Sequence, residues 1–122
     1  MQSISLEGHT ILIVEDEPLI AMDIAAACEA AGATVFAAAS LDTATPLVER
    51  DGLSAAVLDF GFKDGDSSGL CVRLNERAIP YVLHSGYHHL GDACHRGIVV
   101  EKPASSIEIV NVLSQLLGGH NA

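Results

Sequence analysis

The amino-acid sequence predicts an α/β protein in which helices cover both faces of a parallel sheet. Strand-like and helix-like segments alternate along the 122 residues, which is the pattern of successive βαβ units. Most strand candidates are short, continuous apolar runs, as expected of strands that are covered on both faces. Five strands with alternating helices and no GxGxxG motif fit the doubly wound, flavodoxin-like order 2-1-3-4-5 with right-handed crossovers. The strand candidates lie at 10–14, 34–38, 54–58, 80–84 and 97–101.

The first two helices are predicted from their start and stop residues. Pro18 suits the first turn of a helix, where an N–H group has no partner anyway, and Gly32 suits the C-terminal cap. Apolar residues recur at helical spacing between them. Ser40 is a candidate N-cap for a second helix at about 41–50, which Pro46 should shorten or bend.

The later helices are less uniform. A third helix is expected at about 67–77, and the last one begins with a capping box, Ser105-x-x-Glu108, and stops at Gly118. The segment 87–96, YHHLGDACHR, has little helical periodicity. The fourth helix is therefore expected to be short or irregular.

Composition bounds the class of protein. We expect a single domain over residues 1–122, with its core at 9–118. No apolar run approaches the length of a membrane span, and the start lacks the pattern of a signal peptide, so a cytoplasmic location is expected. A formal net charge of −10 without any basic run argues against direct binding of DNA or RNA. The partner of such a domain is expected to be a protein.

The three cysteines show no metal or redox motif. Cys28, Cys71 and Cys94 are odd in number, widely spaced and free of any CxxC pair. We therefore expect all three to be reduced thiols in helices or packing positions.

Polar residues of particular kinds follow four of the strands. The pair Glu15 and Asp16 ends the first strand, Asp59 the third, Ser85 the fourth and Lys102 the fifth. Parallel strands of an open sheet end at one edge, where ligands bind. Singly, each of these residues is most often a turn or capping residue, but their joint occurrence is hard to attribute to chance. The sequence therefore predicts one site with three carboxylates, a hydroxyl and an ammonium group.

A divalent metal would relieve the repulsion among the carboxylates. Mg²⁺ prefers oxygen ligands, keeps several waters and usually takes one or two carboxylates with phosphate oxygens. We expect Asp16 and Asp59 to be direct ligands, Glu15 to act through water or at the rim, and the backbone carbonyl of Gly61 to be a further ligand.

The same set suits phosphoryl transfer. Asp59 stands alone after a central strand and is the better nucleophile candidate for an aspartyl-phosphate. The charge on the transferred phosphoryl oxygens must be neutralised, which Mg²⁺, Lys102 and the Ser85 hydroxyl would do.

With these motifs in place, the chain resembles the receiver domains of bacterial two-component response regulators. The resemblance implies that Asp59 accepts a phosphoryl group from the phosphohistidine of a histidine kinase or phosphotransfer protein. It also implies self-catalysed dephosphorylation, with no other enzymatic activity, signalling through a downstream protein, and a cis peptide bond before Pro103. The matching segments are IVEDEPLIA at 13–21, VLDFGFKDGDSSG at 57–69, LHSGY at 83–87 and VEKP at 100–103.

The sequence departs from the family pattern in four places. Glu15 replaces the more usual Asp, and Lys63 stands where Pro is common. Val99 replaces an aromatic residue that acts as a switch, and only sixteen residues separate Ser85 from Lys102. Because the usual output face of the family involves the fourth helix, these departures put signalling through that face in doubt.

Other interpretations remain open. The domain could be a constitutive protein-binding or homodimerisation module whose phosphorylation site is little used. A small phosphatase acting through an aspartyl-phosphate is disfavoured, because the nucleophile lacks a DxD arrangement. His88, His89 and His95 do not match a known zinc motif, so solvated histidines are expected there. His84 is expected to border the phosphorylation site, with a catalytic role as an alternative.

Overall fold

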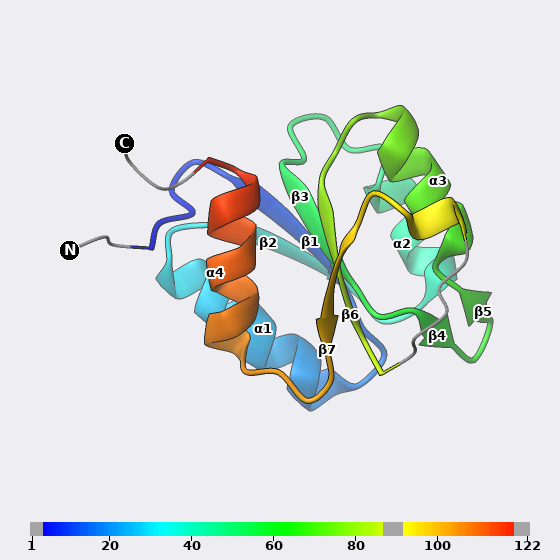
Figure 1. The fold of residues 1–122 in the computed structure, drawn as a ribbon, viewed down its shortest axis with the longest axis horizontal. Coiled ribbons are helices and arrows are strands. Elements are labelled where there is room, and N and C mark those ends of the chain that lie inside the picture. Colours follow the sequence, from blue (N-terminus) through cyan, green and yellow to red (C-terminus); the bar gives the residue numbers. More distant parts are fainter. Residues whose placement is uncertain (1–3, 87–91, 119–122) are drawn as a thin grey trace.

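The computed structural model describes residues 4–86 and 92–118, and its architecture is a five-stranded parallel sheet between two layers of helices (Figure 1). The strand order is β2-β1-β3-β6-β7. Counted along the chain within this sheet, that is the predicted order 2-1-3-4-5, so the flavodoxin-like prediction is confirmed. The strands are β1 (Thr10–Val14), β2 (Thr34–Ala38), β3 (Ala55–Leu58), β6 (Tyr81–Ser85) and β7 (Ile98–Glu101).

Each face of the sheet is covered by its own pair of helices. Helices α1 (Pro18–Ala30) and α4 (Ser106–Leu116) lie on one face, and α2 (Leu41–Leu47) and α3 (Ser68–Glu76) lie on the other (Figure 1). Alternate residues of the central strands belong to the two hydrophobic cores, one on each face of the sheet, because successive side chains of a strand point to opposite faces. In β1, for example, Leu12 packs in the α2–α3 layer and Ile13 in the α1–α4 layer.

The predicted caps explain where two helices begin. The Ser40 hydroxyl accepts the Thr43 N–H at 3.2 Å, and the Ser105 hydroxyl accepts the Glu108 N–H at 3.1 Å. Helix α2 ends at Leu47, earlier than the predicted residue 50. Pro46 lies inside it and cannot donate a backbone hydrogen bond, which accounts for the early end.

A small hairpin, which was not predicted from the sequence, follows β3. Its strands, β4 (Gly61–Phe62) and β5 (Gly65–Asp66), pair in antiparallel fashion outside the main sheet. The hairpin occupies the connection that leads from Asp59 to α3, so it lies next to the predicted site.

The connection between β6 and β7 is short, as predicted. Its described part holds a single 3-10 turn, η1 (Asp92–Cys94), in place of a regular helix. The interpretation of His88 and His89 lies outside the described residues. His95 has its Nδ1 atom 2.7 Å from the carbonyl oxygen of Asp92.

One prediction about the cysteines is wrong. Cys71 in α3 and Cys94 in η1 form a disulfide, whereas Cys28 is free and buried. The topology brings α3 and η1 together, with the two Cα atoms 5.0 Å apart, a separation ordinary for a disulfide. Spacing along the chain could not show this contact, because a whole strand separates the two residues.

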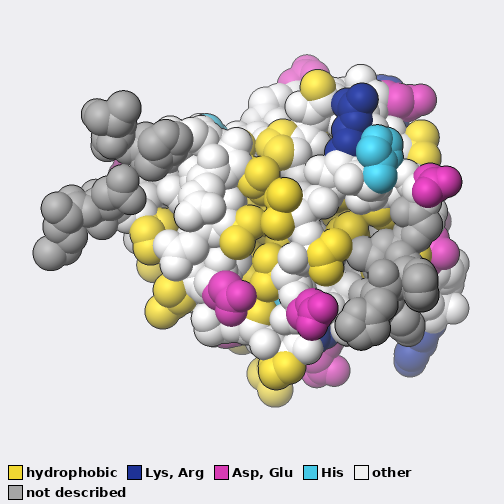
Figure 2. Space-filling model, viewed as in Figure 1, with side chains coloured by type: hydrophobic (Ala, Val, Ile, Leu, Met, Phe, Trp, Pro, Cys, Tyr) yellow, Lys and Arg dark blue, Asp and Glu magenta, His cyan; other side chains and the backbone are white. Residues whose placement is uncertain are grey.

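Hydrophobic side chains are not confined to the two cores. Figure 2 shows them gathered across the middle of the face that carries β7 and α4, and Ile98, Val99 and Ile107 are exposed. None of the helices within residues 4–86 and 92–118 is long and apolar enough to span a membrane.

Candidate functional site

The carboxyl ends of β1 and β3 bring the three predicted acidic residues together. Glu15 and Asp16 follow β1, Asp59 follows β3, and one carboxylate oxygen of each lies within 4.8 Å of the others. The neighbouring strands hold this arrangement, because Glu15 N–H donates to the Ala38 carbonyl at 3.0 Å and Asp59 N–H to the Val14 carbonyl at 2.9 Å. Glu15 and Asp59 are buried and Asp16 is exposed. Three carboxylates so close, one of them open to solvent, match the ligands that a hard divalent cation prefers.

Lys102 contacts the buried side of this cluster. Its Nζ atom lies 3.1 Å from Oδ2 of Asp59 and 3.8 Å from Oε1 of Glu15. Its backbone N–H donates to the Ser85 carbonyl at 3.1 Å, which ties the end of β7 to the end of β6. The peptide bond between Lys102 and Pro103 is cis, as the resemblance implies.

Ser85 and Gly61 stand near the cluster in the fold, and their roles remain predictions. The pairing of Leu58 with Leu83 places Asp59 level with His84, so Ser85 lies one residue beyond Asp59 on the adjacent strand. Ser85 is fully buried. Gly61 opens the hairpin two residues after Asp59, and its partner in that hairpin is Asp66.

Hydrogen bonds on both sides of Asp59 fix its position. Its Oδ1 atom accepts the N–H of Phe60 at 2.8 Å, which leaves Oδ2 facing Lys102. The hydroxyl of Ser67 donates to the Asp59 backbone carbonyl, and the Ser67 N–H donates to the Phe60 carbonyl at 2.8 Å. Sequence reasoning missed this positioning role. Ser67 and Ser68 are equivalent candidates for a helix start in the sequence, and only burial distinguishes them.

The environment of Glu15 favours its neutral form. Burial raises the pKa of Glu15 from 4.5 to about 7, and the charge of Asp59 adds to the rise. The N–H of Glu17, which donates to Oε2 at 3.0 Å, and the charge of Lys102 act in the opposite direction. A carboxyl group with a raised pKa is costly to ionise where it stands, so a further cation beside it would stabilise its charged form.

This shift predicts how stability depends on pH when no divalent cation is present. Between pH 4.5 and about 7 the folded protein holds a proton on Glu15 that the unfolded chain has released. The stabilisation from that proton is complete below pH 4.5 and is lost as the pH rises to about 7. The free energy of unfolding of Glu15→Gln should therefore exceed that of the wild type by an amount that grows between pH 4.5 and about 7. Above about pH 7 the difference should stay constant. Urea denaturation in a chelating buffer measures the difference, and a pH-independent difference would contradict the assignment.

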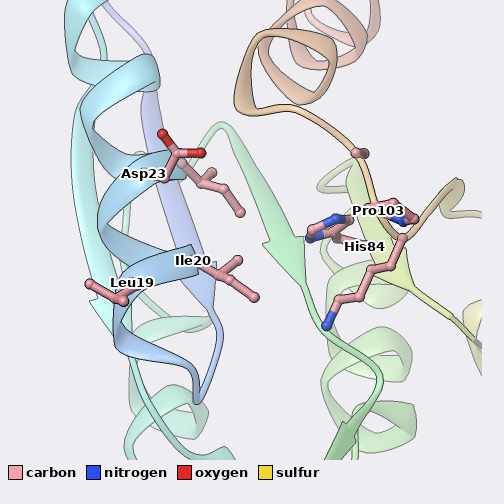
Figure 3. Close-up of a pocket in the computed structure, with 8 residues that line it drawn as sticks. Leu19, Ile20, Asp23, His84 and Pro103 are labelled. Atoms are coloured by element: carbon pink, nitrogen blue, oxygen red, sulfur yellow. The ribbon is translucent and has the colours of Figure 1, made fainter.

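His84, which precedes Ser85 on β6, lines a cavity on the side of that strand that faces α1. The cavity has a volume of about 340 Å³ and lies between α1 and the connection from β7 to α4. Ile20 and His84 point toward one another across it (Figure 3). Neither ring nitrogen of His84 has a hydrogen-bond partner among the described residues, and burial lowers its pKa, with the charge of Lys102 adding to the effect. The predicted position of His84 at the border of the site agrees with this placement.

Comparisons with known proteins place the fold. No protein-family model matches the sequence, and no curated protein matches it. Among solved structures, a receiver domain protein from Methanospirillum hungatei JF-1, described as CheY-like, has a TM-score of 0.81 at 20% identity, with 91% of this chain and 94% of that chain covered. A response regulator receiver protein from Sinorhizobium medicae WSM419 has a TM-score of 0.80 at 28% identity, with 93% and 98% covered.

A third similar solved structure contains a bound metal ion. The receiver domain of a sensor histidine kinase from Pseudomonas aeruginosa PAO1 has a magnesium ion coordinated in its active-site cleft. It matches with a TM-score of 0.77 at 24% identity, and 91% of this chain and 98% of that chain are covered. With TM-scores of 0.77 to 0.81 over at least 91% of its length, this chain has the fold of the receiver domains of two-component response regulators.

Proposed function

We propose that this chain is a phosphoacceptor that takes a phosphoryl group on Asp59 in a Mg²⁺-dependent reaction and signals by binding another protein. The observation that carries the proposal is the contact of Asp59 with Lys102, at 3.1 Å, inside a cluster of three carboxylates. An acidic nucleophile, a fixed cation and a set of metal ligands are the parts that in-line phosphoryl transfer needs.

The residues present fit a magnesium ion. Asp16 and Asp59 would supply carboxylate oxygens, and Glu15 would act directly or through water, since its oxygen lies within 4.8 Å of theirs. When bound, the ion supplies neutralisation of charge on the phosphoryl oxygens. Asp16 is exposed, so the cluster is open to solvent at this residue and a phosphodonor can approach there.

Side-chain and backbone groups of this chain would perform the other steps of the transfer. A carboxylate oxygen of Asp59 attacks phosphorus, the bond from phosphorus to the donor breaks, and its electron pair leaves with the donor. The ammonium group of Lys102 already touches Asp59, so it stands where charge accumulates on the product. The Phe60 N–H and the Ser67 hydroxyl hold Asp59 in place during the attack. Ser85 is proposed to contact the product from the end of β6.

The proposed donor is the phosphohistidine of a histidine kinase or phosphotransfer protein in the cytoplasm. The similar solved structures include a response regulator receiver protein and the receiver domain of a sensor histidine kinase, which supports a histidine kinase as the donor. The acidic charge of −10 and the lack of a basic run support a protein, and not a nucleic acid, as the downstream partner.

The experiment is direct labelling. The protein is incubated with a small-molecule phosphodonor such as acetyl phosphate, with Mg²⁺ or with a chelator, and the intact mass and the labelled peptide are determined. We expect one phosphoryl group on Asp59 with Mg²⁺ and almost none with the chelator. Absence of labelling with Mg²⁺, or labelling on another residue, would overturn the proposal.

One observation favours a second candidate, a constitutive interaction module. Val99 lies on β7, an edge strand of the sheet, and is exposed together with Ile98. A valine has no ring to move between buried and exposed positions, so this candidate predicts the same surface with and without phosphate. Oligomeric state measured with and without beryllofluoride, a phosphoryl mimic, separates the two candidates. An equal result in both conditions would favour the constitutive module.

A further inference from the structure

The connection that follows Ser85 is attached to α3 by a covalent bond. Cys71 lies in the middle of α3, and Cys94 ends the 3-10 turn η1. Close by, the Asn75 side-chain amide donates to the Ala93 carbonyl at 2.8 Å. Besides the disulfide, η1 is held by packing, because Cys94 is buried and Ala93 packs against the core that α3 lines.

The position of this bond in the fold connects it to the strands that carry the site. The described part of the connection, residues 92–97, runs into β7, which ends at Glu101, directly before Lys102. The same connection begins after Ser85 at the end of β6. A bond between Cys71 and Cys94 therefore joins α3 to the chain segment that connects Ser85 and Lys102, two predicted site residues that also share a backbone hydrogen bond.

We propose that Cys71 and Cys94 form a reversible redox-modification site, oxidised by a low-molecular-weight disulfide, that sets how firmly residues 92–97 are held on α3. This inference rests on the cysteine pair and its surroundings and does not require the proposed phosphorylation. In the oxidised form the connection is fixed to α3. In the reduced form only hydrogen bonds and packing hold it.

The chemistry balances as a two-electron exchange. The thiolate of Cys94 attacks one sulfur of the small disulfide, a mixed disulfide forms, and one small thiolate leaves. The thiolate of Cys71 then attacks the Cys94 sulfur, the protein disulfide forms, and the second small thiolate leaves. The protons released by the two cysteines go to the two small thiolates. Both cysteines are buried, so the exchange requires residues 92–97 to open. Cys94 is expected to react first, because its short turn opens more easily than a helix.

Cys28 provides an internal control. It lies in α1 in the other core, and burial raises its pKa to about 11. Cys71 and Cys94 are buried as well, but Cys28 has no partner cysteine and lies in a helix of 13 residues instead of on a short turn. A thiol that stays protonated and buried reacts slowly with disulfides and with alkylating reagents. The native protein should therefore exchange two cysteines and leave the third untouched.

The test begins with purified wild-type protein that is equilibrated in graded mixtures of reduced and oxidised glutathione. Free thiols are then trapped by alkylation and located by mass spectrometry. We expect Cys71 and Cys94 to change together, Cys28→Ser to behave as the wild type, and Cys71→Ser to stop at a mixed disulfide on Cys94. If the wild type forms no bond between Cys71 and Cys94 in the oxidising mixtures, the proposal fails.

Hydrogen exchange measures the structural consequence. Amides of residues 92–97 should exchange about tenfold faster or more in the reduced wild type than in the oxidised one, while those of α1 stay unchanged. Equal exchange in the two states would remove the proposed effect on the connection. The comparison uses a reductant on the wild type, so it does not depend on whether a cysteine variant folds.

Repeating both measurements on Asp59→Asn separates this inference from the proposed function. The redox behaviour should be the same in that variant, because the cysteines lie on α3 and η1, away from the acidic cluster in the chain. Failure of phosphorylation would leave the redox result standing, and failure of the redox result would leave phosphorylation standing.

Discussion

Replacing Asp59 by asparagine is expected to abolish phosphorylation by a small phosphodonor while the fold is retained. The amide has the shape of the carboxylate, so its oxygen can still accept the Phe60 N–H that now reaches Oδ1 at 2.8 Å. It lacks the negative charge that makes an oxygen nucleophilic toward phosphorus. It also removes one of three carboxylates from a crowded cluster, so the stability of the metal-free protein should not fall. Intact-mass measurement of the phosphorylated fraction and a thermal unfolding curve check both parts.

The hairpin after Asp59 offers a matched control. Asp64 is exposed on the turn between β4 and β5, in the same region of the molecule. Asp64→Asn makes the same chemical change and should be phosphorylated as the wild type is. If Asp59→Asn is labelled as well as Asp64→Asn, then another residue accepts the phosphoryl group, and the assignment of the nucleophile is wrong.

The main sheet could be predicted from the sequence because its signals are local. The run at 10–14 is almost wholly apolar, and β1 has those same bounds in the structure. The strand at 34–38 is equally well bounded, since it follows Gly32 at a helix end. The hairpin of β4 and β5 could not be predicted in this way. Each of its strands has two residues, and two residues cannot show a period.

The grouping of the site residues was predictable for a topological reason. Parallel strands end at one edge, so Glu15, Asp59 and Lys102 had to be near one another once the strand order was known. The disulfide and the role of Ser67 depend on tertiary contacts. Cys71 meets Cys94 only because η1 packs on α3. Such contacts leave no mark in the spacing of residues along the chain.

Lys102→Ala is expected to change two properties of the site in opposite directions. The ammonium group lies 3.1 Å from Asp59 and 3.8 Å from Glu15, so it opposes any second cation bound by the same carboxylates. Without it, Mg²⁺ should bind several-fold to about tenfold more tightly, since the site is partly exposed and the charges are partly screened. The rate of phosphorylation should nevertheless fall by about 10²-fold to 10³-fold, because a fixed donor to the charge on the product is lost.

Lys63 is a control that separates the effect of direct contact with Asp59 from the effect of a positive charge near the site. It is exposed on the hairpin and lines a hollow that it shares with Asp16, so it belongs to the same electrostatic neighbourhood. Lys63→Ala removes the same charge without touching Asp59, and only small changes in Mg²⁺ affinity and rate are expected. Magnesium titration and labelling rates at saturating Mg²⁺ measure the two effects separately. A slower reaction that added Mg²⁺ fully restores would mean that Lys102 supports metal binding only. A rate defect that persists in the saturated protein assigns Lys102 to the transfer step itself, because the metal site is then filled in both proteins.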